Sequence, residues 1–492
     1  ITQRKLYDCI IRARDMRLYT AITDNGAGGL SSSVGEMAED TGGCSIYLAK
    51  ALLKYDGLKP WEILLSEAQE RMTLAVPKEN LERFLRLAEE MDVEATPLGE
   101  FTDSGYFHVS YGEKTVACLP MDFMHDGVPQ MRLEARWQRP EERPLAGRDG
   151  RDEGGALEKA LAAKGLDQRS LLLAMLGRLN ICSKEYLIRQ YDHEVKGGSV
   201  VKPLVGLLRD GPSDAAVLRP LLDSESGIVL SHGICPKFSD ADTYWMMANA
   251  IDEAVRNAVA VGADPERLAG VDNFCWCDPV QSEKTPDGRY KLAQLVRACK
   301  ALEQYCLGFG VPCVSGKDSM KNDYTGGGAK ISIPPTVLFS ILGVIPDVNL
   351  AVTSDFKTSG DAIYLVGFTR PELGGSEIAS ELGLEGGSVP HVDLLAAKAH
   401  YTLIHKAMRE KLISACHDLS DGGLAVALAE MALGGRLGAR VNLDRVPAVG
   451  LGQSGSEPLP AGSLISLLSS ESAGRLLVTG PRDNLKPFQR LF

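Results

Sequence analysis

The chain has few of the features that would place it in a membrane, on nucleic acid or in an oxidising compartment. Its 492 residues contain no run of about 18 apolar residues, the length that spans a bilayer. The formal net charge is −12, which argues against nucleic acid or an anionic membrane as the main partner. The chain starts at Ile1 within a helix-like stretch, and we expect no signal peptide.

The sequence also lacks a disulfide framework. Its 11 cysteines are scattered, and only Cys275 and Cys277 stand close together. No second pair follows at zinc-ligand spacing, which disfavours a zinc site. We therefore expect reduced thiols and a cytoplasmic protein.

What the sequence does contain is one stretch that occurs twice. Residues 23–38 read TDNGAGGLSSSVGEMA, and residues 417–432 read HDLSDGGLAVALAEMA. Both have an Asp, three residues, Gly-Gly-Leu and then Glu-Met-Ala at the same spacing. The similarity continues downstream, where LLSEAQERM (64–72) matches LLSSESAGRLL (467–477). Matches at so many fixed offsets indicate a duplicated domain.

The second copy of this stretch carries short acids at the junction between a strand and a helix. Asp418, Ser420 and Asp421 follow an apolar, strand-like run and precede the pair Gly422-Gly423. Carboxylates there could hold a metal, while backbone N–H groups at the helix start face a phosphate. On this stretch alone, an ordinary N-cap cluster explains the residues equally well.

The repeat and the composition together predict an α+β fold, built from duplicated two-layer domains with mixed sheets. Residues 1–133 form the first copy, and residues 134–189 form a charged, Gly- and Pro-rich linker followed by a helical connector. A middle domain spans residues 190–350, and within it we expect strands over residues 199–208 and 227–232. The second copy spans residues 355–492 and lacks counterparts of the two closing strands of the first.

The middle domain contains two further candidate features. Glu253 and Asn257 stand four residues apart on a helix expected over 242–261, so they project from one face of it. Their oxygens could share one hard cation. From spacing alone, a solvated face or a simple side-chain contact is the better interpretation. A strand at 311–314 runs into Ser315–Ser319, which we expect to form a glycine-containing loop that could cradle phosphate. It lacks the Walker spacing.

The motifs SEAQERM, GPSDAAV, GVDNFCW, VPCVSGKDSMKN and HDLSDGGL, together with the duplication, resemble the phosphoribosylformylglycinamidine synthase family of the PurM-like ATP-binding superfamily. The resemblance covers nearly the whole chain except the linker. It implies a ligase of purine biosynthesis that converts formylglycinamide ribonucleotide, ATP and glutamine-derived ammonia to the amidine, ADP and phosphate. It also implies Mg²⁺, which would neutralise charge during phosphoryl transfer, and a glutaminase domain or subunit as the partner.

The resemblance implies two sites. In the catalytic site Asp24 resembles an Mg²⁺ ligand; Glu67, Ala68, Gln69 and Ser319 resemble substrate contacts; and Asp272 and Gly316 resemble ATP contacts. Lys317 stands where short members of the family have a metal-binding Asn, and a protonated Lys cannot bind a cation. In an auxiliary ADP site, the metal ligands would be Asp214, Glu253, Asn257 and Asp418, with Ser213 and Ser420 near the phosphates.

The sequence departs from the family in what it lacks. The family's catalytic His and first ATP-binding domain have no counterpart here, nor does a glutaminase, so the catalytic residues stay unassigned. We interpret His417 as a packing or turn residue. Two hypotheses remain: a fragment of a ligase whose full-length parent makes the amidine, and a non-catalytic module that holds ADP and Mg²⁺ and cannot turn over alone. We expect no turnover from the isolated chain. Another ATP-dependent member of the superfamily is a further alternative.

Overall fold

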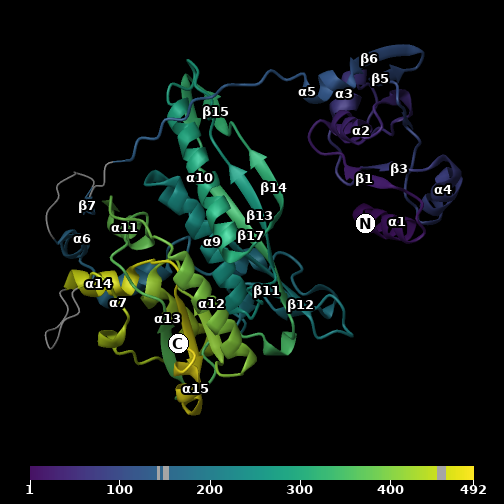
Figure 1. Cartoon of the computed structure of the whole chain (residues 1–492). Coiled ribbons are helices and arrows are strands. Elements are labelled where there is room, and N and C mark those ends of the chain that lie inside the picture. The colour runs from purple at the N-terminus through teal and green to yellow at the C-terminus, as the bar shows by residue number, and fades with distance from the viewer. Residues whose placement is uncertain (141–143, 148–154, 452–460) are drawn as a thin grey trace. The chain divides into compact units, whose positions relative to one another are not determined.

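The computed structural model describes the chain apart from residues 141–143, 148–154 and 452–460, so part of the expected linker lies outside the described residues. The chain divides into two compact units, Ile1–Arg132 and Leu133–Phe492, and each is described by itself. Figure 1 traces their elements. Within the described residues, no helix has both the length and the apolar character needed to cross a membrane.

The first unit combines a small mixed sheet with a separate pair of strands. Its helices and strands are, in order, α1 (Thr2–Asp15), β1 (Ala21–Asp24), α2 (Gly29–Glu39), β2 (Cys44–Tyr47), α3 (Pro60–Leu65), β3 (Met72–Ala75), α4 (Leu81–Glu90), β4 (Gly99–Phe101), β5 (Tyr106–Tyr111), β6 (Lys114–Pro120) and α5 (Met121–Asp126). The sheet has the order β4-β2-β5-β6, in which β2 and β5 are parallel, and β1 pairs with β3 alone.

Two apolar clusters hold the first unit together. Leu30 of α2 packs with Ile46 and Phe107 of the mixed sheet. Cys9 of α1 packs with Phe84 of α4 in a second cluster. Helix α4 presents its apolar residues at intervals of three and four, so they form one buried face.

The second unit holds the largest sheet of the described residues, which has six strands. Its elements are β7 (Ala146–Gly147), α6 (Ala156–Lys164), α7 (Gln168–Leu176), α8 (Glu185–Ile188), β8 (Ser199–Val201), β9 (Leu204–Val205), β10 (Gly211–Pro212), β11 (Ala216–Leu218), β12 (Gly227–Gly233), α9 (Thr243–Ala260), β13 (Leu268–Cys275), α10 (Gly288–Phe309), β14 (Cys313–Ser319), β15 (Asp323–Gly326), β16 (Ala329–Ser332), β17 (Thr336–Ile345), β18 (Ala362–Val366), α11 (Glu377–Leu382), β19 (Leu384–Glu385), α12 (Leu394–Arg409), β20 (Ala415–Asp418), α13 (Gly423–Gly435), α14 (Ala461–Ser469), β21 (Leu476–Gly480) and α15 (Leu485–Gln489).

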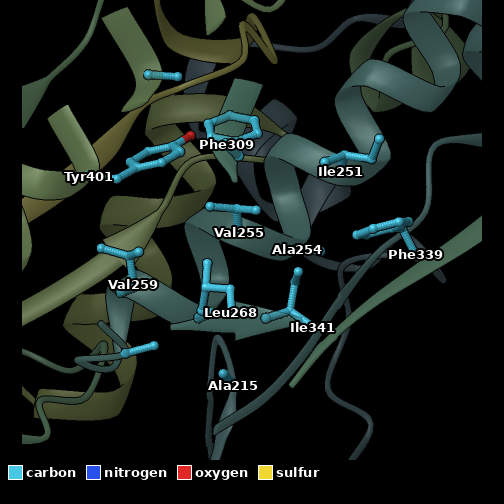
Figure 2. Close-up of a cluster of buried hydrophobic side chains, with 14 of the residues drawn as sticks. Ala215, Ile251, Ala254, Val255, Val259, Leu268, Phe309, Phe339, Ile341 and Tyr401 are labelled. Carbon is cyan, nitrogen blue, oxygen red and sulfur yellow. The ribbon is translucent and has the colours of Figure 1, made fainter. Parts of the chain in front are cut away.

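Helix α9 lies at the centre of this unit. It packs on the six-stranded sheet β14-β13-β17-β12-β11-β8 and also contacts α10, α12 and β20. Strand β12 alternates between buried and more exposed residues, as expected for a sheet with one face against helices. In Figure 2, Phe309 and Tyr401 lie to one side of Val255 on α9, and Phe339 of β17 lies to the other.

The duplication appears as an identical strand register. In the first unit Ala21 pairs with Ala75. In the second unit Ala415 pairs with Thr479, the residues at the matching positions of the repeat. Both copies therefore place their acidic turn at the same end of an antiparallel strand pair.

Two local predictions were wrong. Residues Ser315–Ser319 are part of strand β14 instead of a loop, because they pair in parallel with β13 up to Ser319. The strand expected over residues 199–208 is broken into β8 and β9, which flank Pro203. Proline has no N–H group to donate to a ladder, and this interrupts pairing.

Candidate metal and nucleotide site

The acidic turn of the second copy begins where β20 ends. All four residues of β20 are buried, and Asp418 is the last of them. Gly422 and Gly423 follow with positive φ angles of 79° and 66°, and α13 begins at Gly423. A Cβ atom at Gly423 would lie 2.4 Å from the carbonyl oxygen of Ser470. The paired glycines are therefore required for the helix to start this close to the segment before β21.

Three carboxylates and an imidazole meet at this turn. The Nδ1 atom of His417 lies 2.6 Å from Oδ1 of Asp214, and its Nε2 atom lies 3.1 Å from Oε2 of Glu430. The backbone N–H of Asp418 donates to the same Asp214 oxygen at 3.4 Å. Potential metal-binding atoms of Asp214, His417 and Asp418 all lie within 4.8 Å of one another.

Helix α9 brings three further polar side chains toward this cluster. The guanidinium of Arg256 donates to Oδ2 of Asp418 at 3.2 Å. Glu253 accepts a hydrogen bond at 3.0 Å from the backbone N–H of Ile234. The Nδ2 group of Asn257 donates to the carbonyl oxygen of His232 at 3.3 Å, which leaves its Oδ1 atom for another partner.

Burial raises the pKa of two acids in this cluster. It raises the pKa of Asp214 to about 6, although the neighbouring His417 opposes the shift. It raises the pKa of Glu253 to about 8, where Arg256 opposes the shift and Asp418 reinforces it. Several acids are thus confined in one poorly solvated region, which is costly unless positive charge joins them.

The donor set fits a divalent cation. Among the described residues, Oδ2 of Asp214 and Oδ1 of Asn257 are buried and have no hydrogen-bond partner. Orphaned acceptors are uncommon in protein interiors. Carboxylate and amide oxygens are the ligands that Mg²⁺ and Ca²⁺ prefer. Asp214 and Asp418 lie close enough to share an ion, whereas Glu253 is not in the group of ligand atoms that lie within 4.8 Å of one another in the described residues. The assignment of all four residues as metal ligands stays a prediction.

The serines predicted near the phosphates flank the same cluster. Ser213 precedes Asp214, and its hydroxyl donates to the carbonyl oxygen of Ala215 at 2.8 Å. Ser420 lies in the turn between β20 and α13 and is half-buried.

In the first unit the structure brings the predicted Mg²⁺ ligand close to the predicted substrate segment. Asp24 ends β1 and pairs with Met72, the first residue of β3. The residues predicted to contact substrate come just before this strand: Glu67, Ala68 and Gln69. The backbone and side-chain N–H groups of Asn25 both donate to the carbonyl oxygen of Arg71, each at 3.2 Å, and tie the two segments together.

The predicted ATP contacts of the second unit are also adjacent. Asp272 and Gly316 face each other on the parallel strands β13 and β14. A Cβ atom at Gly316 would lie 2.5 Å from Oδ1 of Asp272, so only glycine leaves room for this carboxylate. Ser319 ends β14, and its hydroxyl accepts a hydrogen bond at 2.6 Å from Lys317.

The sequence interpretation missed the residues that orient the acids. His417 does more than pack, since both of its ring nitrogens have carboxylate partners. Arg256 was not singled out, although it lies on the same helix as Glu253 and Asn257. The spacing of Asp252 and Arg256 on α9 was a signal for an ion pair, but the contacts with Asp214 and Asp418 join segments far apart in the chain.

Comparisons with known proteins agree with this architecture. Residues 1–112 and 358–492 match the sequence model of AIR synthase related protein, C-terminal domain, and residues 212–345 match that of the N-terminal domain. The chain is 34% identical over its full length to "Phosphoribosylformylglycinamidine synthase subunit PurL" of Thermococcus sibiricus and covers 62% of that protein. It is also 34% identical to the PurL subunit of Anaeromyxobacter dehalogenans, where the match covers 96% of this chain and 58% of the relative.

Solved structures of Thermotoga maritima PurL have a similar fold. The complex with ADP is 22% identical with a TM-score of 0.63, and the match covers 97% of this chain and 64% of that one. The complex with FGAR gives the same identity and TM-score over 98% of this chain and 62% of that one. The chain thus spans about three fifths of the length of the relatives it matches.

Proposed function

This chain belongs to the AIR synthase related family, and on that basis we propose that it is the synthetase part of a phosphoribosylformylglycinamidine synthase. The reaction would join ammonia to formylglycinamide ribonucleotide at the expense of ATP and release ADP and phosphate. The observation that carries this proposal is the match to PurL subunits along the whole chain. A glutaminase domain or subunit would supply the ammonia.

The proposed nucleotide site of the second copy would hold Mg²⁺ with ADP. Its metal ligands would be Asp214, Glu253, Asn257 and Asp418, and the serines near the phosphates would be Ser213 and Ser420. The support is the pair of orphaned acceptors in this cluster and the positive N-terminal end of α13 next to it. Mg²⁺ bound there would neutralise phosphate charge.

The catalytic roles that the family implies are proposed for each unit by itself. Asp24 would bind Mg²⁺, and the substrate contacts would be Glu67, Ala68, Gln69 and Ser319. Asp272 and Gly316 would contact ATP. The support within each unit is adjacency, because Asp24 lies beside the 67–69 segment and Asp272 lies against Gly316.

A second candidate is a module that holds ADP and Mg²⁺ without turnover. The observation in its favour is the complete burial of β20, which ends at the proposed metal ligand Asp418. This candidate predicts bound ADP without consumption of ATP.

One experiment separates the two candidates. The purified chain is mixed with formylglycinamide ribonucleotide, ATP and ammonium, and ADP formation is measured; a second sample is denatured, and its released nucleotide is identified by chromatography. Asp418→Asn tests the second-copy site, and Asp24→Asn is the matched variant in the first copy.

Turnover that requires all three reactants supports the ligase. ADP that copurifies with the wild type and with Asp24→Asn, but not with Asp418→Asn, supports the nucleotide site. Copurified ADP without turnover favours the module. If the chain shows no turnover and no bound nucleotide, both candidates are wrong.

A further inference from the structure

Arg256 connects the proposed metal ligand Asp418 to a second buried acid. Its side chain is only 4% exposed, and its two terminal nitrogens point to different carboxylates. One donates to Oδ2 of Asp418 at 3.2 Å, and the other donates to Asp252, one helical turn earlier on α9. A planar guanidinium can bridge two acids in this way, whereas a lysine ammonium at the end of a flexible stem cannot hold both in fixed positions.

Asp252 is itself anchored from two other elements. Its side chain is fully buried, and it accepts hydrogen bonds from the hydroxyl of Tyr401 on α12 at 2.5 Å and from the backbone N–H of Gly474 at 3.0 Å. Figure 2 shows Tyr401 inside the apolar cluster next to Phe309. Arg256 therefore extends from a rigid part of the core toward the acidic turn.

The result is that each aspartate of the cluster gives one oxygen to a buried donor. Oδ2 of Asp418 bonds to Arg256, and Oδ1 of Asp214 bonds to His417. The second oxygen of Asp214 has no partner among the described residues. A carboxylate oxygen that accepts a hydrogen bond keeps a second lone pair, but the donor fixes its direction, so the other oxygen is the better-placed ligand for a cation.

We propose that Arg256 is a positioning residue that makes Asp418 a one-oxygen ligand and thereby favours Mg²⁺ over Ca²⁺ at this site. The inference rests on the proposed metal site of the second copy. Mg²⁺ requires a compact octahedral shell, whereas Ca²⁺ accepts more ligands and often binds both oxygens of one carboxylate. Holding one oxygen of Asp418 away from the ion removes the mode of binding that Ca²⁺ can use and Mg²⁺ does not need.

The test compares the affinities of the two ions. Mn²⁺ bound to the full chain is displaced by Mg²⁺ or by Ca²⁺, and free Mn²⁺ is followed by electron paramagnetic resonance. All variants carry Asp24→Asn, so the acidic turn of the first copy does not contribute. Arg256→Lys keeps the positive charge and loses the bridge; the pair Asp252→Asn with Arg256→Met removes both charges, so neither residue is left as an unpaired buried ion.

The ratio of the two affinities distinguishes positioning from charge. Both ions carry the same charge, so loss of the guanidinium charge alone changes both affinities by the same factor. Release of the second oxygen of Asp418 should instead raise the ratio of Ca²⁺ to Mg²⁺ affinity by about fivefold or more in either variant. Tyr401→Phe is the control: it perturbs the same network away from Asp418 and should leave the ratio unchanged.

The outcomes separate this inference from the proposed function. If the Asp24→Asn parent binds no Mn²⁺, or if adding Asp418→Asn does not weaken binding, the metal site itself is wrong. If the parent binds Mn²⁺ through Asp418 and the ratio stays constant in the variants that fold, Arg256 does not position this ligand. An equal shift of the ratio in Tyr401→Phe would mean that general loosening of the core, and not the bridge, sets ion preference.

Discussion

In the first copy β1 ends at Asp24 in an exposed position, whereas in the second copy every residue of β20 up to Asp418 is buried. The same contrast holds for the segment that packs against each turn. Glu67 is exposed, and its counterpart Glu471 is buried and accepts hydrogen bonds from the backbone N–H groups of Gly422 at 2.8 Å and Glu377 at 2.9 Å. The two copies thus share a strand register and a pair of glycines, but they differ in how deeply their acids are buried.

The difference teaches what the repeated backbone does and what the side chains add. The backbone places an acid, two glycines and a helix start together in both copies. In the second copy, Glu471 accepts a hydrogen bond from the backbone N–H of Gly422 just before α13, whereas Glu67 of the first copy is exposed. Gln69 of the first copy, a predicted substrate contact, is replaced by Ala473 in the second.

The largest expected difference in stability between the copies concerns the arginines at equivalent positions of the repeat, Arg71 and Arg475. Arg475 is completely buried and donates to the carbonyl oxygens of Ser472 and Ser470 and to the hydroxyl of Thr369. We expect Arg475→Met to cost about 3 kcal/mol of unfolding free energy, because it leaves buried acceptors without donors. Chemical denaturation measures the loss of unfolding free energy, and hydrogen exchange of the peptides around Arg475 shows whether the loss is local.

Arg71→Met is the matched variant in the first copy. Arg71 donates to the carbonyl oxygen of Leu52 in an exposed contact, so we expect a loss below about 1 kcal/mol. Equal losses in the two copies would contradict the contrast in burial.

The second prediction concerns what the copies share. Cβ atoms at Gly29 and Gly423 would lie 2.5 and 2.4 Å from the carbonyl oxygens of Ser66 and Ser470, and both glycines have positive φ angles. We expect Gly29→Ala and Gly423→Ala each to destabilise their unit by about 2–3 kcal/mol, from strain and steric overlap together. Gly438→Ala is the control, since its added Cβ would meet no atom within 4 Å. A strong effect in only one copy would show that the shared geometry is not required in both.

The repeat was predictable because duplicated residues preserve local spacing. Asp24 and Asp418 were assigned to equivalent strand ends from sequence, and the structure gives them the same register. The acidic cluster was predictable only through the family resemblance, because Asp214 and Asp418 are brought together by packing between distant segments. Spacing on one helix could suggest Glu253 with Asn257, but it could not show that Arg256 reaches Asp418.

The error at Ser315–Ser319 has a similar origin. Gly316 and Lys317 lower the local preference for a strand, and this favoured a loop. Pairing with β13 overrides that preference, and the glycine is needed because Asp272 occupies the space beside it.

The third prediction uses pH to test the buried acid of the second copy. Burial raises the pKa of Glu471 to about 8. The folded chain therefore retains a proton that the unfolded chain releases near pH 4.5, so the contribution of Glu471 to stability is full below that pH and is lost as pH rises toward 8. Gln keeps an oxygen for both N–H donors and does not ionise. We expect Glu471→Gln to match the wild type near pH 4 and to be more stable at pH 9 by about 1–2 kcal/mol.

Glu67→Gln provides the comparison in the first copy. Its side chain is exposed, and we expect the difference from wild type to stay within about 0.5 kcal/mol at both pH values. Thermal unfolding across this pH range measures both variants. A Glu471→Gln variant that is less stable than the wild type at pH 9 would mean that the ionised carboxylate is the favoured partner of Gly422.

The smallest expected effect tests a contact that both copies keep. The side-chain amide of Asn80 donates to the carbonyl oxygen of Arg17 at 3.3 Å, and that of Asn484 donates to the carbonyl oxygens of Lys411 and Leu412, both at 3.2 Å. Arg17 and Lys411 are both in the left-handed region, with φ angles of 54° and 56°, at the turn that leads into the strand. We expect Asn80→Ala and Asn484→Ala to cost about 1 kcal/mol each, with Asn484 the larger because it satisfies two acceptors. Replacement by Asp, which has the same shape but cannot donate, should cost as much as Ala in both copies; a neutral Asp variant would show that the side chain only fills space, and the turn would then be held by its backbone alone.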